Sequence, residues 1–276
     1  MASIQMKFFS KALKTRTNVN VLLPTLQPSL NDPEPVTSPS TEKVRNFIRK
    51  MGDELPVLYL LHGTFGDEGD WQRFSRLEDY ARNYRVVIVM PQGENSSYRD
   101  MPSGQNYGTY IADELPQLIE WAFPVSRKRE DRFICGLSMG GAGAYKIGLS
   151  HPDRYGYVAS LSGGFRANAT HYGSEVTIWS HAYTPGEPIK GTAEDPCWLA
   201  DQVVGNVNRP ALYMACGSED FLFESNQKLD RHLNDIGYEH AYSVHPGVHN
   251  WDFWDDEIQK VLAWLPIDQI NKIRDL

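Results

Sequence analysis

The feature that most constrains the fold is a series of short, unbroken apolar runs that alternate with segments of helical periodicity. The runs lie at residues 57–61, 86–90, 133–135, 158–161, 211–215 and, more weakly, 241–244. The helical patterns lie at residues 110–121, 142–149, 224–236 and 251–264. Continuous apolar runs are typical of strands that are covered on both faces. The alternation therefore predicts a mostly parallel sheet with helices on both of its faces.

The first two segments of the chain have a different periodicity. Apolar side chains occupy alternate positions, at Ile4, Met6 and Phe8 in the first segment and at Val19, Val21 and Leu23 in the second. Such alternation is typical of strands that bury one face. We therefore predict an antiparallel hairpin whose two strands are joined by residues 11–16.

Two segments interrupt this organisation. The first, from about residue 24 to 53, holds five prolines, which predict a surface loop with at most a short helix over 41–50. The second, at about 163–209, is rich in glycine, proline and large aromatic residues, and we expect it to form a small cap over the site. Because two strands cannot fold alone, we expect a single α/β domain over residues 1–276.

Charge and composition exclude several classes of partner. The chain has 27 basic and 35 acidic residues, a net charge of −8, and no basic stripe, which disfavours nucleic acid and anionic membranes. No apolar run has the length of a signal peptide or a membrane span. The three cysteines, Cys135, Cys197 and Cys216, are too few and too scattered for a disulfide framework or a zinc site. We therefore expect a cytoplasmic protein without a structural metal.

The strongest chemical signal follows the run at 133–135, where the chain reads Gly136-Leu-Ser-Met-Gly140. The Gly-x-Ser-x-Gly spacing fits a sharp strand-to-helix turn that leaves Ser138 strained, with its hydroxyl exposed. The residues two positions away on each side must lack a Cβ for this turn to close. Because the motif lies between a predicted strand and a predicted helix, we interpret Ser138 as a nucleophile rather than as part of a packing turn.

A serine hydroxyl is a weak nucleophile at neutral pH and needs a base that a third group orients. His249 is the best candidate base because it lies in the loop between the last predicted strand and the last helix, whereas His245 ends that strand and is expected to be structural. Asp220 is the preferred acid, since it follows the run at 211–215 and a short carboxylate there can meet His249. Glu219 is the competing acid. The resulting chain order of serine, acid and histidine is the one expected after such a turn.

Two backbone amides are expected to hold a developing oxyanion. Gly63 ends the sequence Leu60-Leu-His-Gly63 after the first parallel run and lets the chain turn, so that the amide of Thr64 faces the site. Met139, the first residue of the helix after the serine, supplies the second amide. His62 precedes the serine in the chain, and we expect it to support this loop rather than to act as the base.

Several aromatic residues are candidate walls of a substrate pocket. They are Phe65, Trp71, Tyr98, Phe165 and Trp179. Ordinary core packing is the alternative for each of them. With such walls and no large lid domain, we expect the pocket to accept short acyl chains.

Together these motifs resemble those of the esterase D family of α/β-hydrolases, over nearly the whole chain. The matching segments are the N-terminal strand pair, Tyr59-Leu-Leu-His-Gly63, Gly136-Leu-Ser-Met-Gly-Gly141, Gly217-Ser-Glu-Asp220 and Gly247-Val-His-Asn-Trp251 with Trp254. Glu114-Leu-Pro116 and Lys128-Arg-Glu130 are similar to the tributyrin esterase branch. Two features depart from the family pattern. The region at 24–56 is longer, which would alter access to the site or contacts in a homo-oligomer, and Asp67 stands where asparagine is common, which would alter only a turn.

The resemblance implies an α/β-hydrolase fold in which Ser138, Asp220 and His249 form a triad and Thr64 and Met139 donate to the oxyanion. It implies a serine carboxylesterase that hydrolyses short-chain acyl esters through an acyl-enzyme, with a small-molecule ester as its partner and no metal or organic cofactor. Alternatives on the same triad are an S-formylglutathione hydrolase, a feruloyl or acetylxylan esterase, and an acyltransferase. A non-catalytic binding module is disfavoured because no member of the triad is missing.

Overall fold

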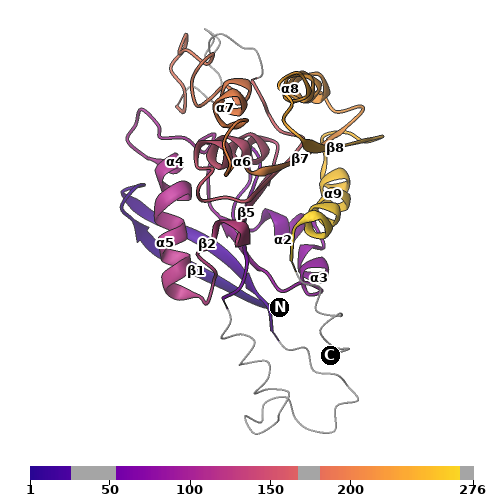
Figure 1. Cartoon of the computed structure of the whole chain (residues 1–276). Helices are drawn as coiled ribbons and strands as arrows, with labels where there is room; N and C mark the ends of the chain where they lie inside the picture. Colours follow the sequence, from indigo (N-terminus) through magenta and orange to yellow (C-terminus); the bar gives the residue numbers. More distant parts are fainter. Residues whose placement is uncertain (26–53, 167–180, 268–276) are drawn as a thin grey trace, which may run out of the picture.

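The computed structural model describes residues 1–25, 54–166 and 181–267, which build an eight-stranded sheet in the order β1-β2-β4-β3-β5-β6-β7-β8 (Figure 1). The strands are β1 (Ala2–Ser10), β2 (Thr15–Leu23), β3 (Val57–Leu61), β4 (Val87–Pro91), β5 (Arg132–Leu137), β6 (Tyr157–Leu161), β7 (Ala211–Gly217) and β8 (His240–His245). Strands β3 to β8 pair in parallel, whereas β2 is antiparallel to both β1 and β4. The prediction of a mostly parallel sheet that begins with an antiparallel hairpin is confirmed.

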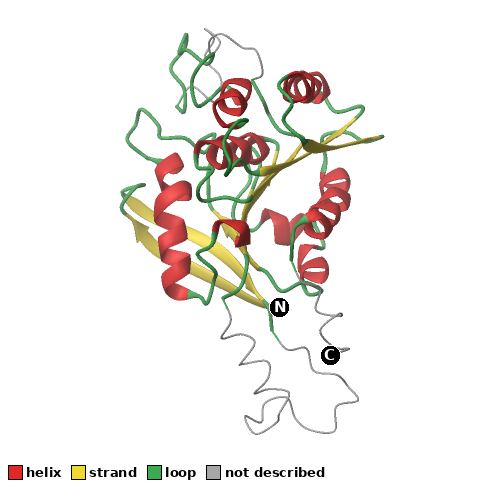
Figure 2. Ribbon diagram, in the orientation of Figure 1, coloured by secondary structure: helices red, strands yellow, loops and turns green. Residues whose placement is uncertain are grey.

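Helices cover both faces of the sheet (Figure 2). One face carries α4 (Tyr107–Thr109), α5 (Leu115–Ala122), α6 (Met139–Ser150), α7 (Pro196–Val203) and α8 (Phe223–Asp235), and the other carries α2 (Asp70–Phe74), α3 (Leu77–Ala81) and α9 (Trp251–Trp264). The side chains of β3 alternate between the two cores: Tyr59 and Leu61 enter the first, and Leu58 and Leu60 the second. This double coverage explains why the central strands are unbroken apolar runs.

The helix predicted over residues 110–121 differs from the observed one. A π-helical turn, η1 (Tyr110–Glu114), separates α4 from α5. Pro116 has no N–H to donate to the carbonyl of Ala112 four residues earlier. That carbonyl instead accepts a hydrogen bond from Arg154 Nη1 at 3.0 Å. The longer turn therefore coincides with a proline that cannot complete the α-helical pattern.

Some predicted segments lie outside the described residues. They include most of the loop predicted at 24–53, the helix predicted over 41–50 and residues 167–180 of the predicted cap. The described part of the segment predicted as a cap contains α7, whose N-cap residue is Asp195. The Asp195 carboxylate accepts hydrogen bonds from the amides of Cys197 and Trp198, and α7 packs against α6 and α8. Among the described helices, none has both the length and the apolar composition needed to cross a membrane.

Candidate active site

Ser138 lies in the turn between β5 and α6, at the carboxyl end of the sheet. Its backbone has φ 53° and ψ −115°, a conformation that is strained for a residue with a side chain. The turn is fixed by the amide of Ser138, which donates to the carbonyl of Leu161, and by its carbonyl, which accepts from Gly164. The serine hydroxyl consequently faces a cavity of about 610 Å³.

The two glycines of the motif are required by close approach of backbone atoms. A Cβ on Gly136 would lie 2.4 Å from the carbonyl of Gly140, and a Cβ on Gly140 would lie 2.5 Å from the carbonyl oxygen of His62. Neither neighbour is the end of a flexible side chain, so the turn itself would have to open. This geometry agrees with the sequence argument that both positions must lack a Cβ.

Replacing Gly140 by alanine is therefore expected to lower the free energy of unfolding by about 1–3 kcal/mol, the usual cost of forcing extra atoms into a packed region. Urea unfolding followed by circular dichroism measures the change. Gly205→Ala is the matched control, because nothing lies within 4 Å of a Cβ added there. If Gly140→Ala proved as stable as Gly205→Ala, the close approach would not be the reason for the glycine.

A continuous hydrogen-bonded line joins three side chains that are distant in the sequence. His249 Nε2 lies 2.9 Å from Ser138 Oγ, and His249 Nδ1 lies 2.9 Å from Oδ2 and 3.1 Å from Oδ1 of Asp220. Ser138 precedes α6, Asp220 follows β7, and His249 lies between β8 and α9. The parallel sheet brings these positions together because the carboxyl ends of its strands share one edge.

The imidazole of His249 packs against two aromatic rings. The Phe221 ring lies 4.5 Å from it between ring centroids, and Trp254 meets it edge-on at 4.9 Å. Asn250, the next residue in the chain, caps α9 by accepting a hydrogen bond from the amide of Phe253. The orientation of the histidine is thus fixed by the start of a helix and by packing.

Asp220 is only 4% exposed and is held in its ionised form. Burial by itself raises the pKa of this carboxyl, but hydrogen bonds from His249, the Leu222 amide and Ser162 outweigh burial and lower the pKa below its ordinary value. Ser162 also accepts a hydrogen bond from Trp254 Nε1 at 3.1 Å. Ser162 and Leu222 were not predicted from the sequence as supports of the acid.

Glu219, the competing acid, makes different contacts. Its carboxylate accepts hydrogen bonds from the amide of Gly247 at 2.7 Å and from Ser218 Oγ at 2.8 Å. These bonds tie the β7 loop to the loop that carries His249, whereas the contacts to the imidazole come from Asp220. Glu219 therefore lies next to the hydrogen-bonded series of Asp220, His249 and Ser138 and is not a member of it.

The loop after β3 lies against the nucleophile. A Cβ on Gly63 would approach Leu137 Cδ1 to 2.5 Å and Ser138 Cβ to 3.4 Å, so glycine allows the loop to come this close. Thr64 and Met139 both line the cavity, and Met139 begins α6, whose first amides have no partner within the helix. Both residues thus lie at the cavity wall with Ser138, the place where the sequence predicts that their amides hold an oxyanion.

His62 supports this loop. Its Nδ1 lies 2.7 Å from the carbonyl oxygen of Gly63, and its Nε2 accepts from the amide of Gly93 at 2.9 Å. Burial lowers the pKa of His62, which favours the neutral ring that these two bonds require. Both ring nitrogens are therefore engaged with backbone groups, as expected for a structural histidine.

The predicted pocket aromatics have different positions. Phe65 lines the cavity and is 77% exposed, with its amide donating to Asn95 Oδ1, and Phe165 also lines the cavity. Trp71 and Tyr98 do not line the cavity. The prediction that they are walls of the pocket is wrong, and both are buried core residues. Trp71 donates to the carbonyl of Leu61 and packs against Trp251, and Tyr98 donates to the carbonyl of His62. Trp179 lies outside the described residues.

Trp251 and Trp254 line the cavity in addition to the predicted residues, as does a charged group formed by Lys146, Glu194 and Tyr183. Lys146 follows Ser138 by eight residues, and Ala142 lies between them. A lysine at this spacing within an otherwise apolar helix is a signal in the sequence that points to this position. Glu194 and Tyr183 carry no such signal, because the segment that holds them has no regular periodicity.

Burial makes Cys135 and Cys216 poor nucleophiles. It raises the pKa of Cys216 to about 12, and it raises the pKa of Cys135 as well. Both thiols are therefore protonated at neutral pH. This supports their interpretation as small core residues.

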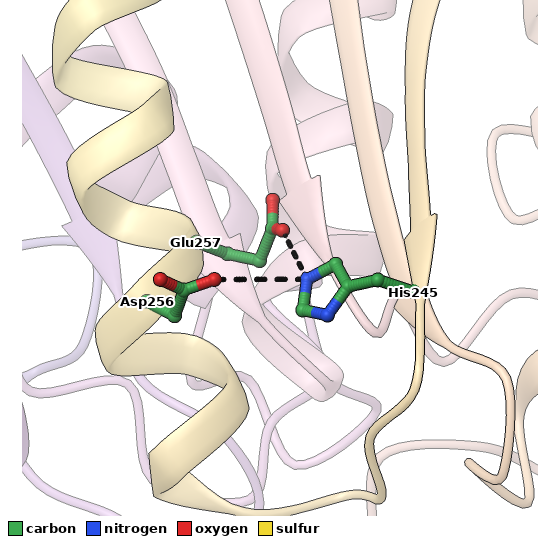
Figure 3. Close-up of side chains that lie close together, drawn as sticks. All are labelled: His245, Asp256 and Glu257. Carbon is green, nitrogen blue, oxygen red and sulfur yellow. Dashed lines mark hydrogen bonds and ion pairs between the residues drawn. The ribbon is translucent and has the colours of Figure 1, made fainter.

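One group among the described residues has the spacing of metal ligands: His245, Asp256 and Glu257, whose donor atoms lie within 4.8 Å of one another (Figure 3). His245 Nε2 lies 2.6 Å from Glu257 Oε1. Lys260 Nζ already donates to Glu257 at 2.7 Å and lies 2.8 Å from Asp256. Because this ammonium supplies the positive charge, the group functions as an ion-pair network that ties β8 to α9.

Comparisons with known proteins give the family. The "Putative esterase" family matches residues 40–265. An acetyl esterase of Caldicellulosiruptor saccharolyticus is 30% identical over 96% of this chain and 98% of its own length. The substrate-bound fluorophosphonate-binding serine hydrolase FphF of Staphylococcus aureus superposes with a TM-score of 0.80 at 29% identity, covering 96% of this chain and 98% of that one.

The S-formylglutathione hydrolase FrmB of Staphylococcus aureus superposes with a TM-score of 0.76 at 28% identity, with the same coverage of 96% and 98%. These similarities confirm the resemblance to esterases and the α/β-hydrolase fold that the sequence predicted. The chain belongs to this esterase family and is a serine esterase, a hydrolase of carboxylic esters.

Proposed function

We propose that Ser138, His249 and Asp220 form the catalytic triad of this carboxylesterase, with Ser138 as the nucleophile. The observation that carries the proposal is the hydrogen-bonded line from Asp220 through His249 to Ser138, with 2.9 Å at each of its two closest contacts. In this arrangement His249 Nε2 accepts the serine proton while Asp220 holds the opposite ring nitrogen in its protonated form.

The reaction proceeds in two balanced halves. Ser138 Oγ bonds to the ester carbonyl carbon as its proton moves to His249 Nε2, and the amides of Thr64 and Met139 hold the resulting oxyanion. The carbon–oxygen bond to the alcohol then breaks, and the alcohol leaves with the proton from His249. Water attacks the acyl-enzyme in the same way, gives a proton to His249 and releases the carboxylic acid, and Ser138 recovers its proton.

The substrates we propose are esters with short acyl chains. The similarity to an acetyl esterase over nearly the full length of both chains supports this class. Exposed aromatic side chains at Phe65 and Phe221 provide an apolar rim for the cavity. Hydrolysis of S-formylglutathione is a second candidate, favoured by the similarity to FrmB. Rates on p-nitrophenyl esters from acetate to octanoate, measured beside S-formylglutathione, separate the two.

A fluorophosphonate probe is expected to label the protein at Ser138, because the probe reacts with an activated serine and mimics the tetrahedral intermediate. Tryptic digestion and mass spectrometry locate the label. Ser138→Ala should abolish labelling, whereas Ser150→Ala, which removes an exposed serine at the other end of α6, should leave it intact. A label on another residue, or none on the native protein, would reject the assignment of the nucleophile.

A further inference from the structure

A group of charged and polar side chains lines the same cavity as the nucleophile. Ser138, Ala142 and Lys146 line the cavity at intervals of four residues, so they share one face of α6. Eight residues of helix span ~12 Å, and the lysine side chain leans back toward the helix N-terminus, which shortens the distance to the serine. Ala142, between them on this face, has only a small side chain.

Lys146 is anchored by acceptors from two other segments. Its Nζ donates to the carbonyl oxygen of Ser97 at 2.7 Å and to Glu194 Oε1 at 3.0 Å. Tyr183 donates to Glu194 Oε2 at 2.6 Å. Ser97 belongs to the loop after β4, and Tyr183 and Glu194 belong to the segment before α7. All four residues line the cavity.

The side chains of Lys146 and Glu194 are mostly buried, and both line the cavity. The Lys146 and Glu194 side chains are 13% and 12% exposed. Burial raises the pKa of Glu194, but the charge of Lys146 and the bond from Tyr183 outweigh it, so the pKa is lowered and the carboxylate is ionised at neutral pH. Two arginines also contact this group: Arg99 pairs with Glu187 and lies 3.7 Å from Glu194 Oε1, and Arg166 donates to the Tyr183 hydroxyl at 2.9 Å.

A buried ion pair is energetically unfavourable as part of the wall of a purely apolar pocket. A buried ion pair commonly contributes no more stability than well-packed apolar residues of the same volume. An alkyl chain that reached the pair would remove water from an ammonium and a carboxylate without replacing its hydrogen bonds. The pair therefore disfavours a long unsubstituted chain at this position.

We propose that Lys146 and Glu194 form a polar subsite for an uncharged hydroxyl or amide at the distal end of the ester substrate. Such a group can accept a hydrogen bond from the Lys146 ammonium and donate one to the Glu194 carboxylate. A carboxylate would lie against the Glu194 carboxylate, and an ammonium would lie against Lys146 and the neighbouring Arg99 and Arg166, so a neutral group avoids both repulsions. The proposal extends the proposed function, since it presumes hydrolysis at Ser138.

The test compares pairs of esters that differ at one terminal atom. In the acyl series, p-nitrophenyl heptanoate is compared with its ω-hydroxy isostere, in which hydroxyl replaces the terminal methyl. In the alcohol series, heptyl acetate is compared with its ω-hydroxy isostere by pH-stat titration. We expect kcat/KM to be about 10- to 100-fold higher for the hydroxylated member of at least one pair, as for other sites with hydrogen-bonding partners.

Variants then assign the preference to the subsite. Lys146→Met, which keeps the length of the side chain, and Glu194→Gln, which keeps its size, should each bring the kcat/KM ratio within a pair toward one. If Lys146→Met does not fold, Glu194→Gln still tests the proposal. Lys228→Met is the matched control, because Lys228 pairs with Glu224 on the surface of α8 and should leave the ratio unchanged.

The outcomes separate this inference from the proposed function. Ser138-dependent hydrolysis of both members of every pair at equal kcat/KM would overturn the polar subsite and leave the nucleophile intact. A preference for an ω-carboxylate isostere over the ω-hydroxy one would overturn the assignment to a neutral group. A hydroxyl preference that survived both Lys146→Met and Glu194→Gln would likewise reject these residues. Activity that persisted in Ser138→Ala would instead contradict the proposed function.

Discussion

Ser138→Ala is expected to lower kcat for p-nitrophenyl acetate by about 10⁴–10⁶-fold, because the variant cannot form the acyl-enzyme. What remains would come from the amides beside the site and from substrate binding. The substitution removes one oxygen atom that hydrogen-bonds to His249. It leaves the backbone turn and both neighbouring glycines unchanged, so the unfolding midpoint should stay close to that of the native protein.

The measurement requires steady-state kinetics and urea unfolding on the same preparations. Ser150→Ala provides the control, because it makes the same chemical change on an exposed position at the end of α6. A Ser138→Ala enzyme with kcat within tenfold of the native value would assign the chemistry to another group. A large loss of stability in that variant would make the kinetic result uninformative about the nucleophile, which is why both quantities are measured.

The sheet and the three hydrogen-bonded side chains, Ser138, His249 and Asp220, could be predicted from the sequence for a common reason. Each lies just after an apolar run, and in a parallel sheet the carboxyl ends of the runs meet at one edge. Glycines on both sides of Ser138 identified the turn, because their lack of a Cβ is a local requirement. Local signals of this kind can be read without knowing which segments pack together.

The residues that the sequence did not reveal depend on packing between distant segments. Trp71 lies in α2, where its indole donates to the carbonyl of Leu61 at the end of β3 and contacts Trp251 at the start of α9, so its burial follows from the tertiary structure alone. Glu194 approaches Lys146 only because the segment before α7 folds over α6. The short helices α2 and α3, of five residues each, provide too few turns for a periodic pattern.

Asp220→Asn is expected to lower kcat by about 10³–10⁴-fold, by analogy with the serine protease triad in which this exchange has been characterised. The amide keeps the size of the carboxylate but can donate a hydrogen bond to His249 Nδ1. The imidazole would then carry its proton on Nε2 and donate to Ser138 Oγ instead of accepting from it. Binding of substrate involves other residues, so we expect KM to change much less than kcat.

The neighbouring carboxylate supplies a matched control for this prediction. Glu219→Gln makes the same change of acid to amide one residue earlier, on a side chain that bonds to Gly247 and Ser218 rather than to the imidazole. We expect it to lower kcat by less than about tenfold, since Gln retains an oxygen that can accept from the Gly247 amide. If Glu219→Gln were the more damaging of the two, Glu219 would be the acid that serves His249, and the contact between Asp220 and His249 would have only a structural role.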